Sequence, residues 1–406
     1  MTHLTANPVA KTTTKRHAVI AGGGIAGLAS AICLSLKNWR VSIYEQSPAF
    51  EEVGAGVQIS PNGTRILDRI GVLERLADSC FEPVALEMRH GSSNRRLLYL
   101  PMADKAVERW QGQYLQVYRP DLIRSLLGVL ENTEDVAIHN ECRVLQYDQG
   151  TSGLTVMLDN DAYTSADLLV AADGIHSNLR QQITVNDKAR FTGNVAWRAV
   201  VPVDRLRNPP PLSACVWTGE GKHAVTTRVR GGEWVNFVGI VEQDDWQVEG
   251  WRVKGSSSEA LQDFGNWNDS ITDIIQRSGD LYRWALLDRP PLPKWSDKAA
   301  VLIGDAAHAM LPSMAQGAVQ CIEDAWVLAE CHEKNCNATT ANQEFYHQRI
   351  ERTRRIQAQS AANLRLFHKR GLLNQVACYA PIWLAGKLLP EAVYRRNDWI
   401  YGQGPL

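Results

Sequence analysis

The spacing of hydrophobic residues divides the chain into stretches with helical and with strand-like patterns. Near the start, an apolar run at 18–21 precedes a glycine-rich turn, a helical pattern from about Ile25 to Leu36 and a second apolar run at 40–44. A strand, a helix and another strand in this order predict a βαβ unit. Residues 167–172, DLLVAA, are apolar after the first position, which is typical of a strand buried in a parallel sheet.

Further helical patterns extend this α/β character. One begins at Pro61, and a second runs from Arg119 to Leu130. A third covers 317–331 and follows an apolar strand at 299–303. The alternation of strands and helices predicts a parallel sheet covered by helices.

The C-terminal part of the chain is predicted to be helical. A long charged helix is expected at 343–370, with arginines on or near its exposed side: Arg349, Arg352, Arg354 and Arg355. An apolar stretch lies within 371–393, where Pro381 and Lys387 interrupt it. We therefore expect a packed terminal helix, with attachment to a membrane or a partner as the alternative.

The pattern changes to short alternating runs between Phe191 and about Val241. Alternating runs separated by turn residues predict antiparallel strands, and 281–287 adds another strand. A run of strands inside a βα alternation predicts an inserted β-rich domain. The predicted organisation is a flexible tail at 1–16, a discontinuous α/β domain at 17–190 and 290–368, a β-rich domain at 191–289 and a C-terminal helical segment at 369–406.

Composition and charge exclude several classes of protein. Of 406 residues, 43 are Lys or Arg and 44 are Asp or Glu, which gives a net charge of −1. A dedicated nucleic-acid binder would carry a basic excess, so nucleic acid is not expected as a partner. The uncharged run at 18–36 has the length of a membrane span, but three consecutive glycines interrupt it, and we expect no membrane insertion.

The eight cysteines are dispersed through the chain. This distribution is typical of reduced thiols in the cytoplasm rather than of a small disulfide framework. Cys331 and Cys336 flank His332 at the spacing of a redox pair or half of a metal site, but no second Cys/His pair accompanies them. The sequence therefore predicts a cytoplasmic protein with no bound metal.

A dinucleotide motif lies at the first strand-to-helix turn. Gly22, Gly24 and Gly27 form G-x-G-x-x-G, in which glycines permit a tight turn and close approach of a pyrophosphate to the helix N-terminus. Glu45 ends the next strand, where its carboxylate can accept hydrogen bonds from ribose hydroxyls and repel a 2′-phosphate. These residues predict a dinucleotide site and leave NAD and FAD both open.

A second glycine-containing turn lies further along the chain. The apolar strand VLI is followed by Gly304 and Asp305, then by Pro312, and Gln316 and Gly317 open the next helix. A helix N-terminus aimed at a bound cofactor would stabilise negative charge, such as that on a reduced flavin ring. This turn therefore favours a flavin.

The chain resembles the class A flavoprotein monooxygenases, the superfamily of para-hydroxybenzoate hydroxylase, and most closely their salicylate hydroxylase-like branch. The resemblance covers nearly the whole chain from about His17. Four blocks match in order: the glycine-rich turn with Glu45, residues 173–180 (DGIHSNLR), residues 304–317, and residues 398–402 (DWIYG). The resemblance implies a Rossmann-like FAD-binding domain of the glutathione reductase type, an inserted antiparallel β-sheet substrate domain and C-terminal helices.

The resemblance also implies that FAD is bound and that NADH or NADPH visits transiently as the reductant. Residues 219–224 nominally read G-x-G-x-x-A, but a strand follows them where a second dinucleotide fold needs a helix. Pro312 is expected beside the reacting ring. The implied cofactor-binding residues are Gly22, Gly24, Gly27, Glu45, Gly56, Val57, Arg119, Asp173, Arg180, Asp305, Gln316, Gly317 and Ala318.

His223 is the candidate catalytic base on the substrate side. It begins a strand of the inserted sheet, and histidine titrates near neutrality, which suits deprotonation of a phenol. A sheet histidine with no catalytic duty is the alternative. Salicylate-like relatives carry a Tyr-Pro pair four residues later, where this chain has Thr227 and Arg228. Arg228 and Arg230 share one strand face, which meets either a substrate carboxylate or solvent.

The activity that the resemblance implies is hydroxylation of a small aromatic substrate with O2, through a flavin C4a-hydroperoxide formed after NAD(P)H reduces the flavin. A salicylate-like or related phenolic acid is the expected substrate, and a monomer or homodimer the expected state. Two alternatives stay open: a hydroxylase of a quinoline, phenazine or nicotinate-type compound, and a non-catalytic FAD-binding protein.

Overall fold

The computed structural model describes residues 15–50, 54–150, 153–184, 189–243 and 253–405. Most of the predicted tail at 1–16 lies outside the described residues. Arg16 is nevertheless held against the protein, because it donates a hydrogen bond to the carbonyl of His332 (2.8 Å) and lies 4.2 Å from the ring centre of Trp39. The folded part of the chain therefore begins slightly earlier than predicted.

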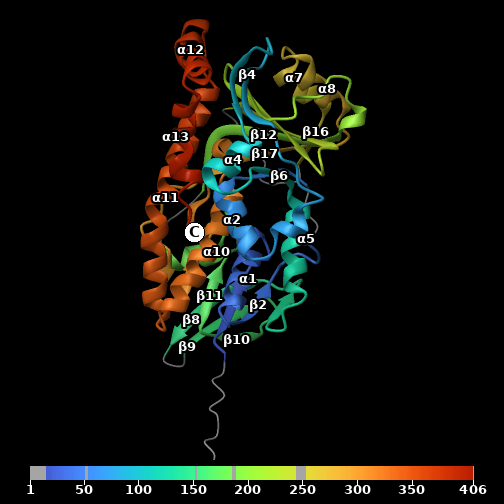
Figure 1. Ribbon diagram of the computed structural model, residues 1–406. Helices are drawn as coiled ribbons and strands as arrows, with labels where there is room; N and C mark the ends of the chain where they lie inside the picture. Colours follow the sequence, from blue (N-terminus) through green and yellow to red (C-terminus); the bar gives the residue numbers. More distant parts are fainter. Residues whose placement is uncertain (1–14, 51–53, 151–152, 185–188, 244–252, 406) are drawn as a thin grey trace, which may run out of the picture.

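A six-stranded sheet forms the lower part of the molecule in Figure 1, with the strand order β18-β19-β11-β1-β2-β7. Its strands are β1 (His17–Ala21), β2 (Arg40–Tyr44), β7 (Val136–His139), β11 (Leu168–Ala171), β18 (Ser296–Asp297) and β19 (Ala300–Leu302). β1 pairs in parallel with β2 and β11, as the βαβ pattern predicts. All residues of β1 and β11 are buried, so both faces of this sheet are covered.

Helices and a small second sheet provide that cover. α1 (Ile25–Leu36) contacts β1 and β2 and packs beside α5 (Arg119–Leu130) and α10 (Gly317–Lys334). The antiparallel strands β8 (Val144–Gly150), β9 (Gly153–Leu158) and β10 (Tyr163–Ala166) contact β1 and β11. This arrangement confirms the predicted Rossmann-like α/β domain.

An eight-stranded sheet with the order β16-β17-β12-β15-β14-β13-β4-β5 forms the upper part. Its strands are β4 (Ala85–His90), β5 (Arg96–Pro101), β12 (Arg190–Pro202), β13 (Ala214–Gly219), β14 (Lys222–Val229), β15 (Trp234–Glu242), β16 (Val253–Gly255) and β17 (Leu281–Asp288). The sheet is larger than the predicted insert at 191–289, because β4 pairs in parallel with β13. Such long-range pairing leaves no local pattern in the sequence.

Alternate residues of this sheet face two different environments, as the period of a strand requires. One face packs on α7 (Ser257–Phe264) and α8 (Asp269–Arg277), and its buried residues include Trp197, Trp217 and Phe237. The other face looks toward the α/β domain. The alternation therefore separates a hydrophobic core from a wall that is available to a ligand.

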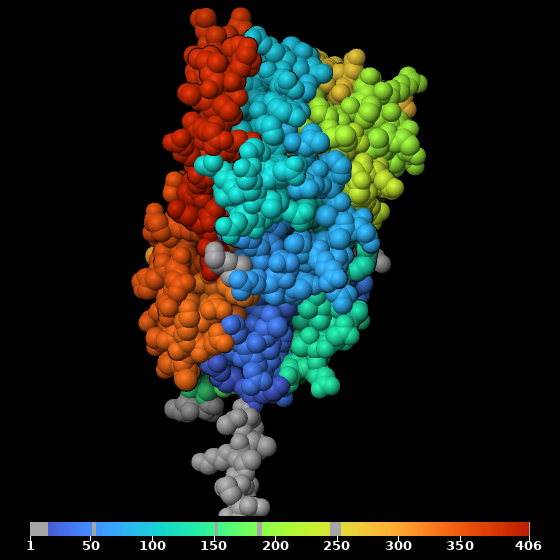
Figure 2. Space-filling view, viewed as in Figure 1, coloured from blue at the N-terminus to red at the C-terminus, as the bar shows by residue number. Residues whose placement is uncertain are grey.

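The C-terminal helices form one edge of the molecule (Figure 2). They are α11 (Ala338–Phe367), α12 (Leu372–Leu388) and α13 (Pro390–Tyr401). α13 packs through Tyr394 and Ile400 against Trp110. α12 packs against β5 on one side, but Leu372, Leu373, Val376, Trp383, Leu384 and Leu388 are exposed. The prediction of a packed terminal helix is thus wrong for the outer side of α12.

The remaining elements connect these layers. They are β3 (Gly56–Ile59), β6 (Leu115–Tyr118), α2 (Pro61–Arg69), α3 (Leu73–Leu76), α4 (Ala103–Trp110), α6 (Asn178–Ile183), α9 (Asp305–His308) and two short 3-10 turns, Val203–Arg205 and Pro312–Met314. β3 and β6 pair as a separate two-stranded sheet. None of the helices in the described ranges has the length and apolar character that crossing a membrane requires.

Candidate functional site

A cavity of about 710 Å³ lies between the α/β domain and the eight-stranded sheet. This volume is within the range of roughly 300–1,000 Å³ that is typical of small-molecule and cofactor sites. The predicted site residues on its wall are Gly22, Gly24, Glu45, Gly56, Val57, Arg119, Asp173, His223, Asp305, Pro312, Gly317 and Ala318. Gly27, Arg180 and Gln316 do not line it.

The glycine-rich turn has one closed and one open side. A Cβ on Gly27 would lie 1.9 Å from the carbonyl oxygen of Gly22, so only glycine lets α1 begin this close to the turn. A Cβ on Gly24 would meet no atom within 4 Å. Since Gly24 lines the cavity, this open side leaves room for a pyrophosphate beside the N-terminus of α1.

Glu45 lines the cavity together with Gln46 and Ser47. Its carboxylate accepts hydrogen bonds from the backbone N–H of Gly23 (2.7 Å) and of Ser47 (2.9 Å). These bonds fix the carboxylate beside the glycine-rich turn. Each carboxylate oxygen has a second lone pair, so Glu45 can still accept from a ribose hydroxyl.

Asp173 lines the cavity, and one of its two carboxylate oxygens is held by hydrogen bonds. Its Oδ2 accepts from the backbone N–H of Asn178 (3.0 Å), whereas its buried Oδ1 has no hydrogen-bond partner within the described part of the chain. Burial raises the pKa of Asp173 above its ordinary value, although hydrogen bonds oppose the shift. An unsatisfied buried oxygen beside a cavity is suited to a donor group on a bound cofactor.

Arg180 connects the block at 173–180 to the second glycine turn. Its side chain is 1% exposed and donates to the carbonyls of Ala306 (2.6 Å) and Ala307 (3.3 Å) in α9. Arg180 therefore stabilises the backbone of α9 behind the cavity wall and does not line the cavity itself. A cofactor-binding role for Arg180 stays a prediction.

The N-terminus of α10 opens into the cavity. A Cβ on Gly317 would meet no atom within 4 Å, and the first backbone N–H groups of a helix lack intrahelical partners. Gln316 precedes this helix, and its side chain points away to donate to the hydroxyl of Ser60 (2.8 Å). Asp305 lies on the cavity wall with its side chain exposed to the cavity, and desolvation by the surrounding protein raises the pKa of its carboxyl group.

Asn236 joins β3 to the eight-stranded sheet and was not predicted. Its Oδ1 accepts from the backbone N–H of Gly56 (2.7 Å), and its Nδ2 donates to the hydroxyl of Thr227 (3.1 Å). A Cβ on Gly56 would lie 2.7 Å from the Asn236 side chain, so glycine permits this approach. The bonds hold β3 against the substrate side of the cavity.

His223 and Arg198 project from the same face of the sheet into the cavity. Arg198 is 6% exposed, and its guanidinium lies 4.9 Å from the ring centre of Trp284. The two arginines that the sequence suggested for a substrate carboxylate lie elsewhere. Arg228 donates to the carbonyl of Pro210 (2.8 Å), and Arg230 lies over Tyr118. Arg198, not Arg228 or Arg230, is therefore the sheet arginine that lines the cavity.

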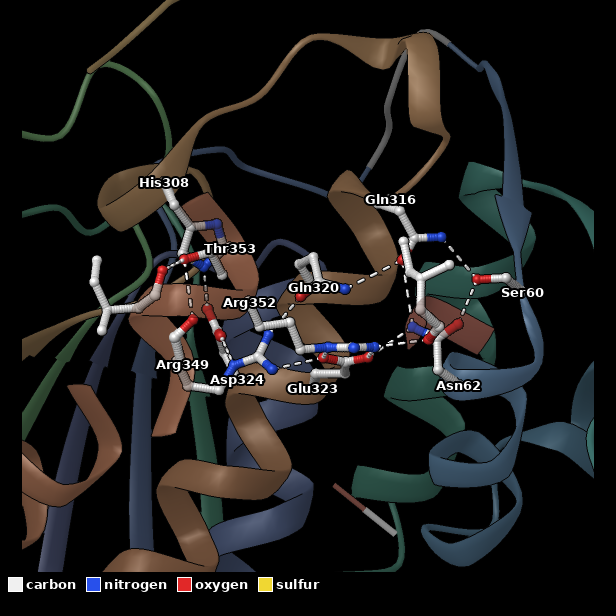
Figure 3. Close-up of polar contacts among 12 residues, drawn as sticks. Ser60, Asn62, His308, Gln316, Gln320, Glu323, Asp324, Arg349, Arg352 and Thr353 are labelled. Carbon is white, nitrogen blue, oxygen red and sulfur yellow. Dashed lines mark hydrogen bonds and ion pairs between the residues drawn. The ribbon is translucent and has the colours of Figure 1, made fainter. Parts of the chain in front are cut away.

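A buried ionic network supports the wall from behind, between α10 and α11 (Figure 3). Arg349 donates to Asp324 (2.7 Å) and to Glu323 (2.5 Å), and Arg352 donates twice to Glu323 (2.7 Å each). Arg349 is 2% exposed, so the prediction that it lies on the exposed side of its helix is wrong. Arg349 points inward because it pairs with two buried acids on α10.

This network reaches the second glycine turn. Asp324 Oδ2 accepts from the backbone N–H of Gly304 (2.9 Å) and lies 2.6 Å from Nε2 of His308. Although burial raises it, the charges of His308 and Arg349 lower the pKa of Asp324 to about 2. Asp324 is therefore ionised at neutral pH and holds the turn that carries Asp305.

These features define an α/β dinucleotide-binding enzyme whose cofactor site opens onto a substrate sheet. The open sides of Gly24 and Gly317 and the unpartnered Oδ1 of Asp173 fit FAD. A family model described as FAD binding domain matches residues 15–359, and the chain belongs to this family.

Individual proteins agree with this assignment. The chain is 33% identical over 409 residues to 3-amino-4-hydroxybenzoate 2-monooxygenase PtmB3 of Streptomyces platensis, with 99% of this chain and 98% of that protein covered. It is 32% identical over 316 residues to 6-hydroxynicotinate 3-monooxygenase of Pseudomonas fluorescens, with 77% and 81% covered. Klebsiella pneumoniae HpxO complexed with FAD and uric acid has the same fold, with a TM-score of 0.85, 22% identity, and 96% and 97% of the chains covered.

The chain is thus an FAD-dependent monooxygenase of the aromatic hydroxylase class, as the sequence predicted. Enzymes of this class take electrons from NADH or NADPH. Residues 219–224 form the end of β13, a turn and the start of β14, so they do not form a second dinucleotide fold. The alternative of a non-catalytic FAD-binding protein is set aside.

Proposed function

We propose that this enzyme hydroxylates a small aromatic acid that carries a ring hydroxyl group, and that Arg198 and His223 hold its two polar ends. The observation that carries the proposal is the placement of both side chains on one sheet face inside the FAD cavity. β15 lies between their strands, so their backbones are separated laterally by two strand spacings, roughly 10 Å. An aromatic acid fits between side chains that reach inward from such positions.

Arg198 supports an anionic substrate. Its guanidinium lines the cavity, and a planar carboxylate matches the fork of N–H donors that a guanidinium presents. Val225, Val238 and Ile240 line the cavity on the same sheet face and offer apolar contact to a ring. The combination favours an aromatic carboxylate over a neutral phenol.

His223 supports a hydroxylated ring. Burial and the neighbouring His368 hold the pKa of His223 well below its ordinary value, so its side chain is neutral at pH 7. A neutral imidazole accepts a proton from a phenol, which raises the electron density of the ring before oxygen transfer. We therefore assign the proton-accepting role to His223.

The flavin-facing residues serve orientation and the exclusion of water. FAD, when bound, supplies the hydride acceptance and oxygen activation that no side chain provides. The N-terminus of α10 stabilises negative charge next to Gly317 and Ala318, and Pro312 lines the same cavity. A dry cavity favours oxygen transfer to the substrate over release of peroxide.

Two ring types agree with this site. The names of the relatives include a hydroxybenzoate and a hydroxynicotinate, which share a carboxylate and a ring oxygen substituent. A salicylate-like phenolic acid is our first choice. The absence of a Tyr-Pro pair at Thr227 and Arg228 favours a hydroxynicotinate-type ring as the second.

The FAD-loaded protein is expected to oxidise NADH or NADPH faster in the presence of such acids. Oxidation should be measured with 3-hydroxybenzoate, salicylate, 3-amino-4-hydroxybenzoate and 6-hydroxynicotinate, with hydroxylated product and hydrogen peroxide quantified together. Stimulation with matching product supports the proposal. Stimulation only by neutral phenols would contradict the carboxylate class.

Arg198→Met is expected to weaken binding of the stimulating acid by about 10- to 150-fold, because a charge-assisted hydrogen bond contributes about 1.5–3 kcal/mol. Titration of the flavin absorbance with the acid measures this change. The matched control is the carboxamide of the same acid, which should bind the wild type and the variant with similar affinity. Equal loss for the acid and the amide would show that Arg198 supports the fold and not the carboxylate.

We also infer a cytoplasmic location and a monomeric or homodimeric state. All eight cysteines are free thiols, and five of them are buried in the structure: Cys33, Cys142, Cys215, Cys321 and Cys331. Free thiols in this number support a reducing compartment. Size-exclusion chromatography with light scattering tests the oligomeric state.

A further inference from the structure

A chain of three side chains leads from the cavity toward solvent. His223 Nδ1 lies 2.6 Å from Nε2 of His368, and His368 Nδ1 lies 3.1 Å from Oε1 of Glu242. The side chain of His368 is 3% exposed, whereas that of Glu242 is 37% exposed. The chain therefore runs from a residue on the cavity wall, through a buried imidazole, to a carboxylate in contact with water.

The carboxylate fixes the direction of every hydrogen bond in this chain. An ionised Glu242 only accepts, so His368 carries its proton on Nδ1 and donates it to Glu242. His368 Nε2 is then an acceptor, and His223 must donate to it from Nδ1. This arrangement leaves the lone pair of His223 on Nε2, the only ring nitrogen available to a ligand in the cavity.

We propose that His368 and Glu242 are positioning residues that set the tautomer of His223 and conduct the substrate proton from the cavity to solvent. The proposal rests on the proposed function, in which His223 accepts a proton from the ring hydroxyl. Neither His368 nor Glu242 reaches the substrate itself. They act through His223.

Each proton transfer in this relay is balanced. The substrate O–H bond breaks as an N–H bond forms at His223 Nε2, and the Nδ1 proton of His223 moves to Nε2 of His368. The Nδ1 proton of His368 then moves to Glu242, which releases it to water. The substrate remains as a phenolate, and no electron leaves or enters the chain.

The surroundings support neutral histidines beside an ionised carboxylate. Burial lowers the pKa of His368, although Glu242 opposes this shift. Burial raises the pKa of Glu242, but hydrogen bonds from Arg370 and His368 lower it below its ordinary value overall. The other charged groups here point elsewhere: Glu220 accepts from the backbone N–H of Gly371, and Lys222 donates to the carbonyl of Asp263.

The relay is tested by the ionisation of a bound chromophoric phenol, 3-hydroxy-4-nitrobenzoate, on the FAD-loaded protein. The wild type should bind this probe as the phenolate at pH values at least one unit below the transition of the free probe, and release one proton to a pH indicator. Glu242→Gln removes the ionised acceptor that holds the proton on His368 Nδ1, and its neutral amide cannot take up the relayed proton. This variant and His368→Gln should lose the shift and slow proton release at least tenfold.

Glu220→Gln is the matched control, because it makes the same charge change at the same end of α11 but lies outside the relay. It should ionise the probe as the wild type does. FAD content and unfolding temperature are compared for all variants. If His368→Gln fails to fold, the test relies on Glu242→Gln, because the side chain of Glu242 is 37% exposed.

The outcomes separate the two proposals. A wild type that neither binds the probe nor shows aromatic-stimulated NADH oxidation would overturn the proposed function, and the relay with it. A wild type that binds and is stimulated, with unchanged phenolate formation in both relay variants, would overturn the relay alone. Binding of the un-ionised phenol by the wild type would also overturn the relay.

Discussion

Gly24→Val is expected to give a folded protein that no longer retains FAD. A Cβ at this position meets no atom of the protein within 4 Å, so we expect the fold to tolerate valine. The new methyl groups instead occupy the space beside the N-terminus of α1 that a pyrophosphate needs. Overpacking of this kind costs about 1–3 kcal/mol, which corresponds to as much as about 150-fold in affinity. Flavin absorbance after desalting and a titration with FAD measure the loss.

Two further glycines provide the comparison. Gly279→Val also enters open space, but Gly279 does not line the cavity, so this variant should keep both its fold and its FAD. Gly27→Val should instead disrupt the fold itself, because a Cβ there overlaps the carbonyl oxygen of Gly22 and disturbs the start of α1. Retained yellow colour in Gly24→Val would overturn the assignment of this turn to the pyrophosphate.

Local patterns were sufficient to predict the elements that frame the cofactor site. The strand, turn and helix within 18–36 and the helix at Arg119–Leu130 were predicted correctly, because each has its own periodicity and start signal. The hairpin of β4 and β5 was not predicted to join the eight-stranded sheet. Its place depends on pairing of β4 with β13, more than 100 residues later in the chain, and no local pattern encodes that pairing.

The substrate side of the cavity was predicted less completely for a similar reason. His223 stood out by its chemistry, but Arg198 lies in the run VAWRAVV, where an arginine between apolar residues resembles an isolated surface charge. The signal that distinguishes it is the period of two, since Val195, Trp197 and Ala199 pack in the core on the opposite face. His368 had no signal at all, because only the tertiary fold brings the end of α11 to β14.

Arg349→Met is expected to reduce the free energy of unfolding by about 3–5 kcal/mol, because removal of one partner of a buried ion pair leaves buried negative charge that is only partly compensated. Glu323 and Asp324 are both fully buried, and Arg349 bonds to each. Since Asp324 also holds the Gly304 turn, FAD content should fall as well. Urea unfolding followed by fluorescence measures the stability. Arg354→Met, on the exposed side of the same helix, is the control and should change it by less than about 0.5 kcal/mol.

The pH dependence of stability provides an independent check on the same network. The pKa of Asp324 lies at about 2 in the folded protein, below the ordinary aspartate value of 3.8. A carboxyl group with a lowered folded pKa contributes stability that is fully present above its unfolded pKa and is lost as the pH falls from about 4 toward 2. Without the charge of Arg349 this pKa rises, so acid unfolding of Arg349→Met should begin at a higher pH. The double variant Arg349→Met/Asp324→Asn should recover part of the stability, since one uncompensated charge is then gone. If the double variant is as unstable as the sum of its single changes, lost packing and not buried charge explains the effect, because coupled charges are non-additive.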